Sequence, residues 1–567
     1  MIPAPSHRAL VLSLLAALFL VGTFSARAQE EPTDAPEEQP FFETVDVNVV
    51  NVDVFVTDKK GNPILDLEKD DFEILEDGRT VPITNFYAVR GERPEAPRPG
   101  ARVPREAREK AEPAADERID EAQRLYLIVF VDNFNIKPFN RNRVFRELRQ
   151  FLRDTIERGD KVMLVTYDRT LETRVSFTGD PGVINRALLE IEEETGYNVH
   201  RDSERREVLR SIEESDRYLT PLQRVRTYAE SYYSDVQFTL DAMRDLISSL
   251  GGLPGRKAMV HVSDGIPMIP GEDLFVAIQE KFQATSILSE IRQYDTSRRF
   301  EELARHANAN RVTFYTIDAA GLRTQTNVSV EASTPGVGMM VHHTYVHNLQ
   351  APLLKLAEDT GGQAIINSNF VGDDLMEVAK DFDSYYSLGY QPAHAGDGRY
   401  HRIRVRVDRE GAKVRHRTGY RDKSLSQRMS DTTMAALVFG EQSNPMGLDL
   451  RVGEAVPQTE GRHYTVPVTV EIPLDRLTMV PVRESHEARV QLFVAALDSE
   501  GGTSPVQNTR VPIRIPSEEL ERARTQSWAY EIPLLMRRGR QRLAVGLHDD
   551  LGGDTSFVTK SFVVGSS

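Results

Sequence analysis

The sequence predicts a multidomain protein built around an open, doubly wound and mostly parallel α/β sheet. Between residues 125 and 368, short continuous apolar runs alternate with helix-spaced apolar positions, as expected for parallel strands buried on both faces. Segments on both sides of this region alternate apolar with polar residues, which indicates antiparallel β modules. At 567 residues the chain is too long for one hydrophobic core, so several domains are expected.

The beginning of the chain has the pattern of an export signal. Residues 1–28 combine a basic start, an apolar run and an Ala-x-Ala cleavage site, and the run is too short for a membrane span. Residues 29–42 are acidic and rich in proline, which predicts a disordered lead-in. We therefore expect an exported protein, periplasmic or secreted, with no transmembrane segment once the signal is cleaved.

Composition excludes several kinds of chemistry. The chain has no cysteine, so disulfides, thiolate metal sites and cysteine nucleophiles are excluded. Its formal net charge is −16, which makes it a poor binder of nucleic acid and keeps an exported protein soluble.

The flanking regions are expected to form two β modules. Residues 43–90 alternate apolar with polar side chains around an Asp77-Gly78 hairpin turn, which predicts a small β module. Residues 91–122 are dense in proline and charge and are expected to be a linker. Residues 430–567 contain several alternating strands at regular spacing, which predicts a β-sandwich of immunoglobulin-like character.

The central region, residues 123–421, carries the α/β pattern. A helix is expected over residues 142–156 and a helical insertion over about 181–250. A hairpin around Glu410-Gly411 is expected to extend or cover an edge of the sheet. The parallel strands are expected at residues 125–131, 161–167, 257–263, 311–318 and 362–368.

The chain resembles the von Willebrand factor type A domain, in particular the bacterial exported VWFA-related proteins. The phrases that carry the resemblance are LIVFVDNFN, LGGLPGRKAMVHVSDG, RVTFYTIDAAGL and LAEDTGGQAI, together with VTDKKGNPILDLEKDDFEILEDG and YYSLGYQP. The resemblance covers roughly residues 43–421. It implies a Rossmann-like sheet that binds protein ligands through a divalent ion at the carboxyl ends of the strands, where open α/β sheets generally place ligands.

The family holds its ion with an Asp-x-Ser-x-Ser loop, a threonine and a late aspartate, and this chain matches only part of that set. Asp132 matches the first aspartate and Asp264 the late one, but Phe134 and Ile136 stand where the two serines would be. For the threonine, only Ser234 and Thr239 are available, and Thr239 falls inside an expected helix. The resemblance therefore implies a degenerate metal-ion-dependent adhesion site.

Two interpretations of these carboxylates remain open. The sheet order that the family implies puts the first strand beside the fourth and the fourth beside the fifth, so Asp132, Asp264 and Asp318 should end neighbouring strands. With Asn135 they could hold Mg²⁺, Ca²⁺ or Mn²⁺, which prefer oxygen ligands. Alternatively, the aspartates cap helices or bind backbone N–H groups.

Other candidate chemistry is weaker. His342, His343 and His347 could bind Zn²⁺ if they lay on a helix, but the preceding residues favour a loop over the edge of the sheet, and no glutamate base follows His343. The glycines match neither a P-loop nor a dinucleotide fingerprint, and no nucleophile elbow is present.

The sequence thus predicts an exported, non-enzymatic binding protein without a certain cofactor. We expect its partner, a protein or another cell-envelope ligand, to contact the carboxyl ends of the strands. The residues expected at this contact are Asp132, Asn133, Asn135, Asp264 and Asp318. Two alternatives remain, a metal-dependent or hydrolytic extracytoplasmic enzyme and a structural scaffold of the envelope.

Overall fold

The computed structural model divides the chain into two compact units. Among the described residues, one unit ends at Arg428 and the other begins at Met429. The described residues are 49–90, 124–156, 159–195, 198–284, 286–323, 338–394, 396–440, 443–458 and 463–565. The expected signal, lead-in and linker, like the first residues of the small β module, lie outside these ranges.

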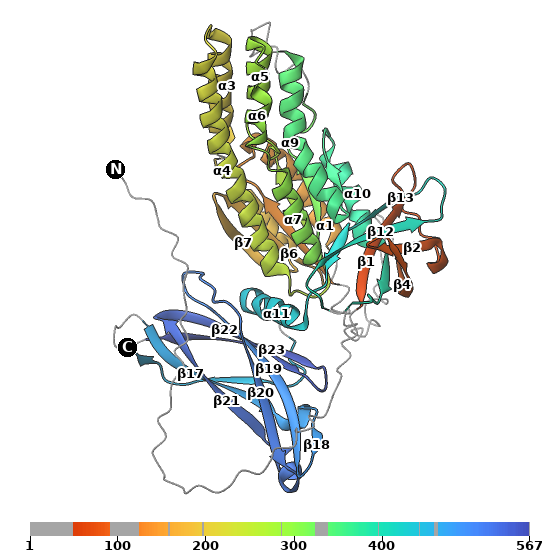
Figure 1. Ribbon diagram of the computed structural model, residues 1–567, viewed down its shortest axis with the longest axis vertical. Coiled ribbons are helices and arrows are strands. Elements are labelled where there is room, and N and C mark those ends of the chain that lie inside the picture. Colours follow the sequence, from red (N-terminus) through yellow and green to blue (C-terminus); the bar gives the residue numbers. More distant parts are fainter. Residues whose placement is uncertain are drawn as a thin grey trace, which may run out of the picture. The chain divides into compact units, whose positions relative to one another are not determined.

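A six-stranded, mostly parallel sheet forms the centre of the first unit (Figure 1). Its order is β10-β9-β8-β5-β6-β7, and only the edge strand β7 runs antiparallel to its neighbour. The strands are β5 (Leu125–Val131), β6 (Lys161–Asp168), β7 (Thr170–Thr178), β8 (Arg256–Ser263), β9 (Val312–Asp318) and β10 (Ala364–Ile365). The predicted parallel strands and their order, β5 beside β8 and β8 beside β9, are confirmed.

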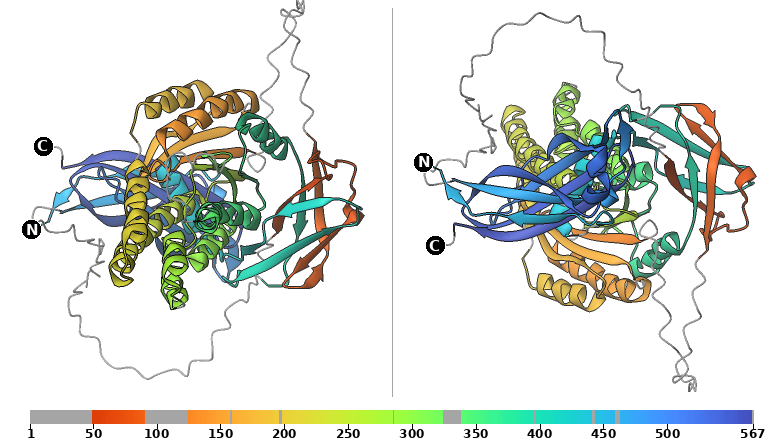
Figure 2. Two further views of the ribbon diagram at one scale, coloured as in Figure 1. Left: turned by 90° about the horizontal axis from the view of Figure 1, so that it is seen from above. Right: turned by 90° about the horizontal axis from the view of Figure 1, so that it is seen from below.

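Helices connect these strands. They are α1 (Pro138–Thr155), α2 (Pro181–Glu192), α3 (Asn198–Glu214), α4 (Leu219–Leu250), α5 (Glu272–Phe282), α6 (Ile287–Arg292), α7 (Ser297–Ala309), α9 (Met339–Thr360) and α10 (Val371–Asp383). Helices α3, α4, α5 and α9 extend side by side beyond the sheet (Figures 1 and 2). The loop predicted around His342, His343 and His347 is wrong, because these residues lie in the first turns of α9.

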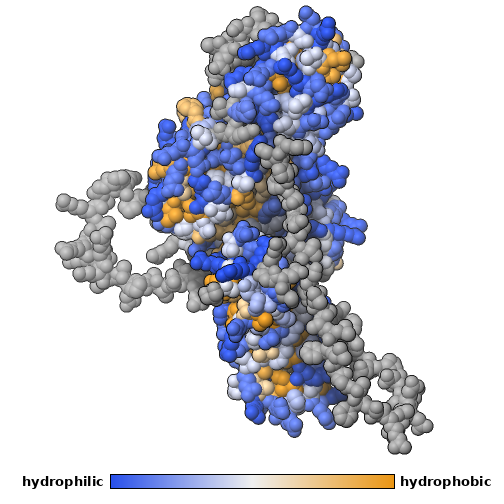
Figure 3. Space-filling model, turned by 90° about the vertical axis from the view of Figure 1, so that its left-hand side faces the viewer, coloured by the Kyte–Doolittle hydropathy of each residue, from blue (hydrophilic) through white to orange (hydrophobic). Residues whose placement is uncertain are grey.

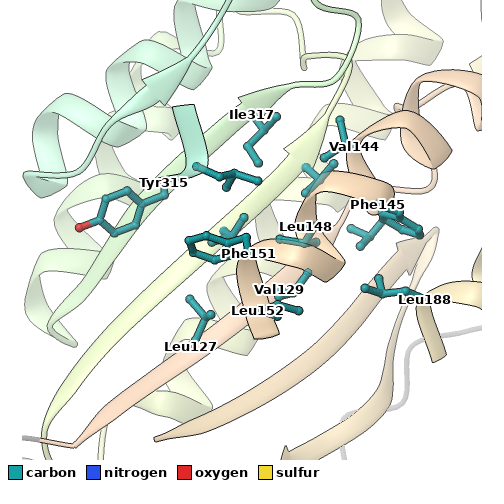
Figure 4. Close-up of a cluster of buried hydrophobic side chains, with 14 of the residues drawn as sticks. Leu127, Val129, Val144, Phe145, Leu148, Phe151, Leu152, Leu188, Tyr315 and Ile317 are labelled. Carbon is teal, nitrogen blue, oxygen red and sulfur yellow. The ribbon is translucent and has the colours of Figure 1, made fainter. Parts of the chain in front are cut away.

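The buried face of α1 shows why this helix forms and where it packs. Proline at its first position suits an N-terminus, where its missing N–H leaves no bond unmade. Val144, Leu148 and Phe151 recur at helical spacing and are buried against Val129 of β5 (Figure 4). Full burial of such a side chain is worth about 2 kcal/mol.

The strands of residues 50–90 and 384–421 together form one β-sandwich, in which red and teal strands interleave (Figure 2). The strands are β1 (Val50–Thr57), β2 (Phe72–Glu76), β3 (Arg79–Val81), β4 (Ile83–Arg90), β11 (Ser384–Tyr390), β12 (Tyr400–Val407), β13 (Lys413–His416) and β14 (Gly419–Arg421). The two sheets have the orders β13-β1-β11-β4 and β14-β12-β2-β3, and they enclose one hydrophobic cluster.

This pairing corrects an expectation. The hairpin expected around Glu410-Gly411 does not form and does not extend the parallel sheet, because β12 pairs with β2 in one sheet of the sandwich and β13 pairs with β1 in the other. Alternation in the sequence predicts the strands but does not identify their partners. The α/β region is thus inserted between β4 and β11 of the first sandwich.

The second unit contains two antiparallel sheets around one hydrophobic cluster. Its elements include α11 (Leu425–Phe439), which the sequence did not predict and which begins just before the unit boundary. The strands are β15 (Asp449–Val452), β16 (Val456–Pro457), β17 (His463–Pro473), β18 (Val480–Val482), β19 (Ser485–Leu497), β20 (Gln507–Pro516), β21 (Ser527–Arg537), β22 (Gly539–Asp549) and β23 (Thr555–Val564). The immunoglobulin-like character of this unit stays a prediction.

The surface is largely polar. On the face drawn in Figure 3, hydrophilic residues predominate and apolar residues form separate patches. None of the helices in the described ranges combines the length and apolar character that crossing a bilayer requires.

Candidate functional site

The three aspartates predicted to lie at the carboxyl ends of neighbouring strands do so. Asp132 follows β5, Asp264 follows β8 and Asp318 ends β9. In the register of the sheet, Val131 lies opposite Val262, and Ser263 lies opposite Asp318. We call these three aspartates, with Asn133 and Asn135, the rim.

Both carboxylate oxygens of Asp132 accept hydrogen bonds. Oδ1 accepts from the backbone N–H of Asn135 at 3.1 Å and from its side-chain amide at 3.2 Å. Oδ2 accepts from the same amide and from the hydroxyl of Ser263, both at 3.0 Å. Asn135 therefore uses both its backbone N–H and its side-chain amide as donors to this carboxylate.

Asp264 is held by the N-terminal end of α1. Its Oδ2 accepts from the backbone N–H of Lys137 at 2.9 Å, and the side-chain amide of Asn140 reaches Oδ1 at 3.0 Å and Oδ2 at 2.9 Å. Burial raises the pKa of this carboxyl to about 6, although these hydrogen bonds and the charge of Arg323 act in the opposite direction.

Asp318 forms an ion pair with an arginine and accepts a hydrogen bond from an amide. Its Oδ1 accepts from the backbone N–H of Ala320 at 3.1 Å and from Arg323 Nη2 at 3.0 Å. Its Oδ2 accepts from the amide of Gln350, on α9, at 2.8 Å. Because Arg323 also donates to the backbone oxygen of Asp264, it links the ends of two strands.

Asn133 belongs to a second network, centred on the buried guanidinium of Arg141. Arg141 donates from Nη1 to Asn133 Oδ1 at 3.1 Å and from Nη2 to the backbone oxygens of Glu192 and Glu194 at 3.2 and 2.8 Å. The amide of Asn133 donates to Glu194 Oε2 at 3.2 Å. This network ties the β5–α1 connection to the end of α2.

The positions of the missing hydroxyls are filled by apolar side chains. Phe134 and Ile136 are buried, and the ring of Phe134 packs edge-on against Tyr167. The two residues considered in place of the family's threonine do not supply a hydroxyl to the rim either. Ser234 and Thr239 both lie within α4 and donate to the carbonyl oxygens of Glu230 and Asp235, one turn earlier.

The rim is covered, which corrects the prediction that its side chains form a partner contact. All five rim residues are between 0% and 5% exposed. Helix α9 lies over the exit of β8, where the side chain of Asn348 bonds the backbone of Ile269 at both its N–H and its carbonyl oxygen. Gly265 must be glycine here, because its φ is +101° and a Cβ would lie 2.6 Å from the backbone oxygen of Leu349.

Helix α3 contributes a second part of this cover. Asp202 forms an ion pair with Lys137, next to Asp264, and Arg205 donates to Asp273 of α5 at 2.7 Å. The guanidinium of Arg205 also lies 3.9 Å from the ring centroid of Tyr345 on α9. A partner could reach the rim carboxylates only if these helices moved.

Sequence reasoning missed His261, which is fully buried below Asp132. Its Nε2 lies 3.9 Å from Asp132 Oδ2, and neither ring nitrogen has a hydrogen-bond partner within the described ranges. The signal was a polar residue within the otherwise apolar run from Ala258 to Val262. Arg141, Arg323 and Gln350, which hold the rim, gave no local signal at all.

The rim does not fit the ion of the family. Each of the six carboxylate oxygens of its aspartates accepts at least one hydrogen bond, both oxygens of Asp132 accept two, and Phe134 and Ile136 offer no oxygen where the family has serines. Within the described residues, trios of acidic or histidine side chains whose ligand atoms all lie within 4.8 Å of one another occur elsewhere in the chain. The rim is therefore a set of hydrogen-bonded carboxylates and not a common ligand sphere.

Comparison with protein-family models found no match, and no curated protein matches the chain either. Solved structures that are similar include an aerotolerance-related membrane protein of Bacteroides fragilis with multiple mutations to serine, at 10% identity and a TM-score of 0.23, covering 46% of this chain and 98% of that one. Another is a von Willebrand factor type A protein of Catenulispora acidiphila, at 8% identity and a TM-score of 0.21, covering 78% of this chain and 66% of that one. At TM-scores this low, the likeness says nothing about the function of this chain.

Proposed function

We propose that the chain is an exported, non-enzymatic binding protein that recognises a protein or another cell-envelope partner with its type A-like region, and that this recognition needs no metal ion. The observation that carries the proposal is that every rim carboxylate oxygen accepts at least one hydrogen bond from a protein donor. With its carboxylates bonded to the surrounding loops, the rim serves to hold these loops in place, and the partner binds to the surface around it.

The surface next to the rim offers exposed apolar side chains. Phe139, Leu322 and Phe370 are 80%, 49% and 73% exposed. Phe139 lies in the first turn of α1, Leu322 follows β9, and Phe370 directly precedes α10. Asn369 accepts from the backbone N–H of Leu322 at 3.3 Å, which joins the β9 exit to the start of α10.

Helix α1 is joined to the β9 exit by Arg143, which donates to the backbone oxygen of Ala319 at 2.7 Å. Phe139 lies one helical turn before Arg143 and therefore on the same side of α1. Large apolar side chains exposed together in this way are typical of protein contact surfaces. We call Phe139, Leu322 and Phe370 the apolar edge.

The test is capture of partners from the extracytoplasmic fraction of the producing cell by the immobilised full chain. The double variant Phe139→Glu/Phe370→Glu should retain at least tenfold less partner than the wild type, because it puts charge into the apolar edge. The matched control is Phe238→Glu, since Phe238 lies on α4 and is 60% exposed.

The ion requirement is tested on the same material. After EDTA treatment, capture should be equal whether Mg²⁺, Ca²⁺ and Mn²⁺ are restored or withheld. Capture that depends on one of these ions would contradict the ion-free part of the proposal. Equal capture by the wild type and the double variant would contradict the placement of the contact.

A further inference from the structure

Two histidines and four acidic side chains gather at one end of the first sandwich, whereas the rim lies on the parallel sheet. We call them the histidine–carboxylate cluster: Glu76, Asp77, His394, Asp397, His401 and Asp422. They come from the end of β2 and its turn, from the β11–β12 connection, from β12 and from the residue after β14. One ligand atom from each of Glu76, His394 and His401 lies within 4.8 Å of the other two.

His394 has one ring nitrogen held and the other unused. Its Nδ1 lies 2.9 Å from Oδ2 of the buried Asp422. Its Nε2 is inaccessible to solvent, has no hydrogen-bond partner and lies 3.4 Å from Oε2 of Glu76. The hydroxyls of Tyr390 and Tyr420 both donate to Oε1 of Glu76 at 2.7 Å, which fixes this carboxylate with Oε2 toward His394.

His401 is arranged in a similar way. Its Nδ1 lies 2.8 Å from Asp77 Oδ2, and its Nε2 lies 3.2 Å from both oxygens of Asp397. The two imidazole rings are stacked, with centroids 3.9 Å apart and planes at 17°. In both histidines, therefore, a carboxylate orients Nδ1 while Nε2 faces a second carboxylate.

We propose that this cluster binds one divalent transition-metal ion of the Zn²⁺ type through His394 Nε2, His401 Nε2, Glu76 Oε2 and the carboxylate of Asp397. Imidazole and carboxylate ligands in a set of four suit Zn²⁺, whereas Mg²⁺ and Ca²⁺ prefer oxygen alone. Zn²⁺ bonds of about 2.0–2.1 Å in tetrahedral geometry put ligand atoms roughly 3.4 Å apart. The Glu76–His394 and His401–Asp397 distances already match this spacing, and binding tilts the stacked rings until both lone pairs converge on the ion.

The surroundings match those of known zinc ligands. Metal-bound histidines commonly donate their second ring N–H to a carboxylate, which fixes the tautomer and the ring orientation. Asp422 and Asp77 occupy these positions for His394 and His401. The side chains of His394 and Asp397 are 26% and 28% exposed, which gives an ion access from solvent.

The ion would join segments that are distant in the sequence. Asp77 and His401 are 324 residues apart, and the whole α/β region lies between them. In a chain without cysteine, a structural ion is the available cross-link between the two halves of this sandwich. The site is independent of the rim and of the apolar edge.

The test uses the full chain, freed of metal with EDTA and then titrated with ZnCl₂ in a calorimeter. The wild type should bind one equivalent at this site, and Co²⁺ in its place should give the visible absorption of a four-coordinate ion with nitrogen ligands. His394→Ala and His401→Ala should each weaken this binding about 100-fold or more. Asp77→Asn should weaken it about 10- to 100-fold, because it removes only the orienting carboxylate.

Two features keep the test decisive. Asp77 is half-exposed with a φ of +47°, a conformation that asparagine also adopts, so this variant should fold. The control His343→Ala/His347→Ala removes the histidine pair of α9 and should leave the titration unchanged. The proposal is overturned if the wild type binds no Zn²⁺, if both histidine variants bind like the wild type, or if only the α9 control loses binding.

Discussion

The rim and the histidine–carboxylate cluster are both rich in carboxylates, but they differ in what surrounds these groups. At the rim, Asn135, Gln350 and Arg323 donate to the carboxylates, and every aspartate oxygen has such a donor. In the cluster, the second ring nitrogen of His394 has no donor or acceptor of its own and faces Glu76.

This difference indicates what each group can bind. A carboxylate whose oxygens accept hydrogen bonds from loop donors anchors those loops, and a cation would have to compete with the donors for its lone pairs. Carboxylates that instead orient imidazoles leave lone pairs available for a metal. The family motif directs attention to the rim, whereas the contacts favour the cluster as the metal site of this chain.

The largest expected effect tests whether protein donors hold the rim. Arg141→Met should lower the free energy of unfolding of the α/β region by roughly 3–5 kcal/mol, because Asn133 and two backbone oxygens lose a buried charged donor. Urea unfolding followed by circular dichroism measures the change. Arg153→Met, an exposed position on the same helix, should change it by less than about 0.5 kcal/mol, and equal effects of the two variants would argue against this account.

A somewhat smaller effect concerns pH. The pKa of Asp264 is about 6 in the folded chain and near 3.8 when unfolded, so between these values the folded state binds the extra proton. Its contribution is fully present below about pH 4 and is lost as pH rises through 6, which amounts to about 3 kcal/mol.

The variant Asp264→Asn should remove this dependence, so that its unfolding free energy falls less between pH 4 and 7 than that of the wild type. Urea unfolding at a series of pH values gives both curves. Asp241→Asn changes an exposed carboxylate and should follow the wild type. Parallel curves for wild type and Asp264→Asn would contradict a buried Asp264 carboxyl with a raised pKa.

The smallest effect isolates one donor of Asp132. Ser263→Ala removes the hydroxyl that donates to Oδ2 and accepts from the backbone N–H of Gly265, and should cost about 2 kcal/mol of unfolding free energy. Ser234→Ala, on the exposed side of α4, should be nearly neutral. A neutral Ser263→Ala would mean that the Asp132 carboxylate is satisfied in another way.

Much of the α/β fold could be predicted because its signals are local. The apolar run Leu125–Val131 coincides with β5, and the order of β5, β8 and β9 follows from the resemblance. The same local signals identified Asp132, Asp264 and Asp318 as strand-end residues. They also identified Phe134 and Ile136 as side chains that cannot bind an ion.

The remainder depended on contacts between distant residues. Alternation in residues 400–416 predicts strands but does not say that they pair with β1 and β2. The cover over the rim comes from α3 and α9, and Gln350 reaches Asp318 from 32 residues away. The cluster joins residues 76–77 to residues 394–422, so no motif of fixed spacing could have revealed it.

The central claim, that the type A-like rim holds no ion, is tested most directly by calorimetric titration of Mg²⁺, Ca²⁺ and Mn²⁺ into EDTA-treated full chain and its Asp132→Asn variant. We predict that the two proteins give superimposable isotherms with each ion, because the Asp132 carboxylate is already saturated by Asn135 and Ser263. One equivalent of Mg²⁺, Ca²⁺ or Mn²⁺ bound by the wild type and lost in Asp132→Asn would contradict the claim.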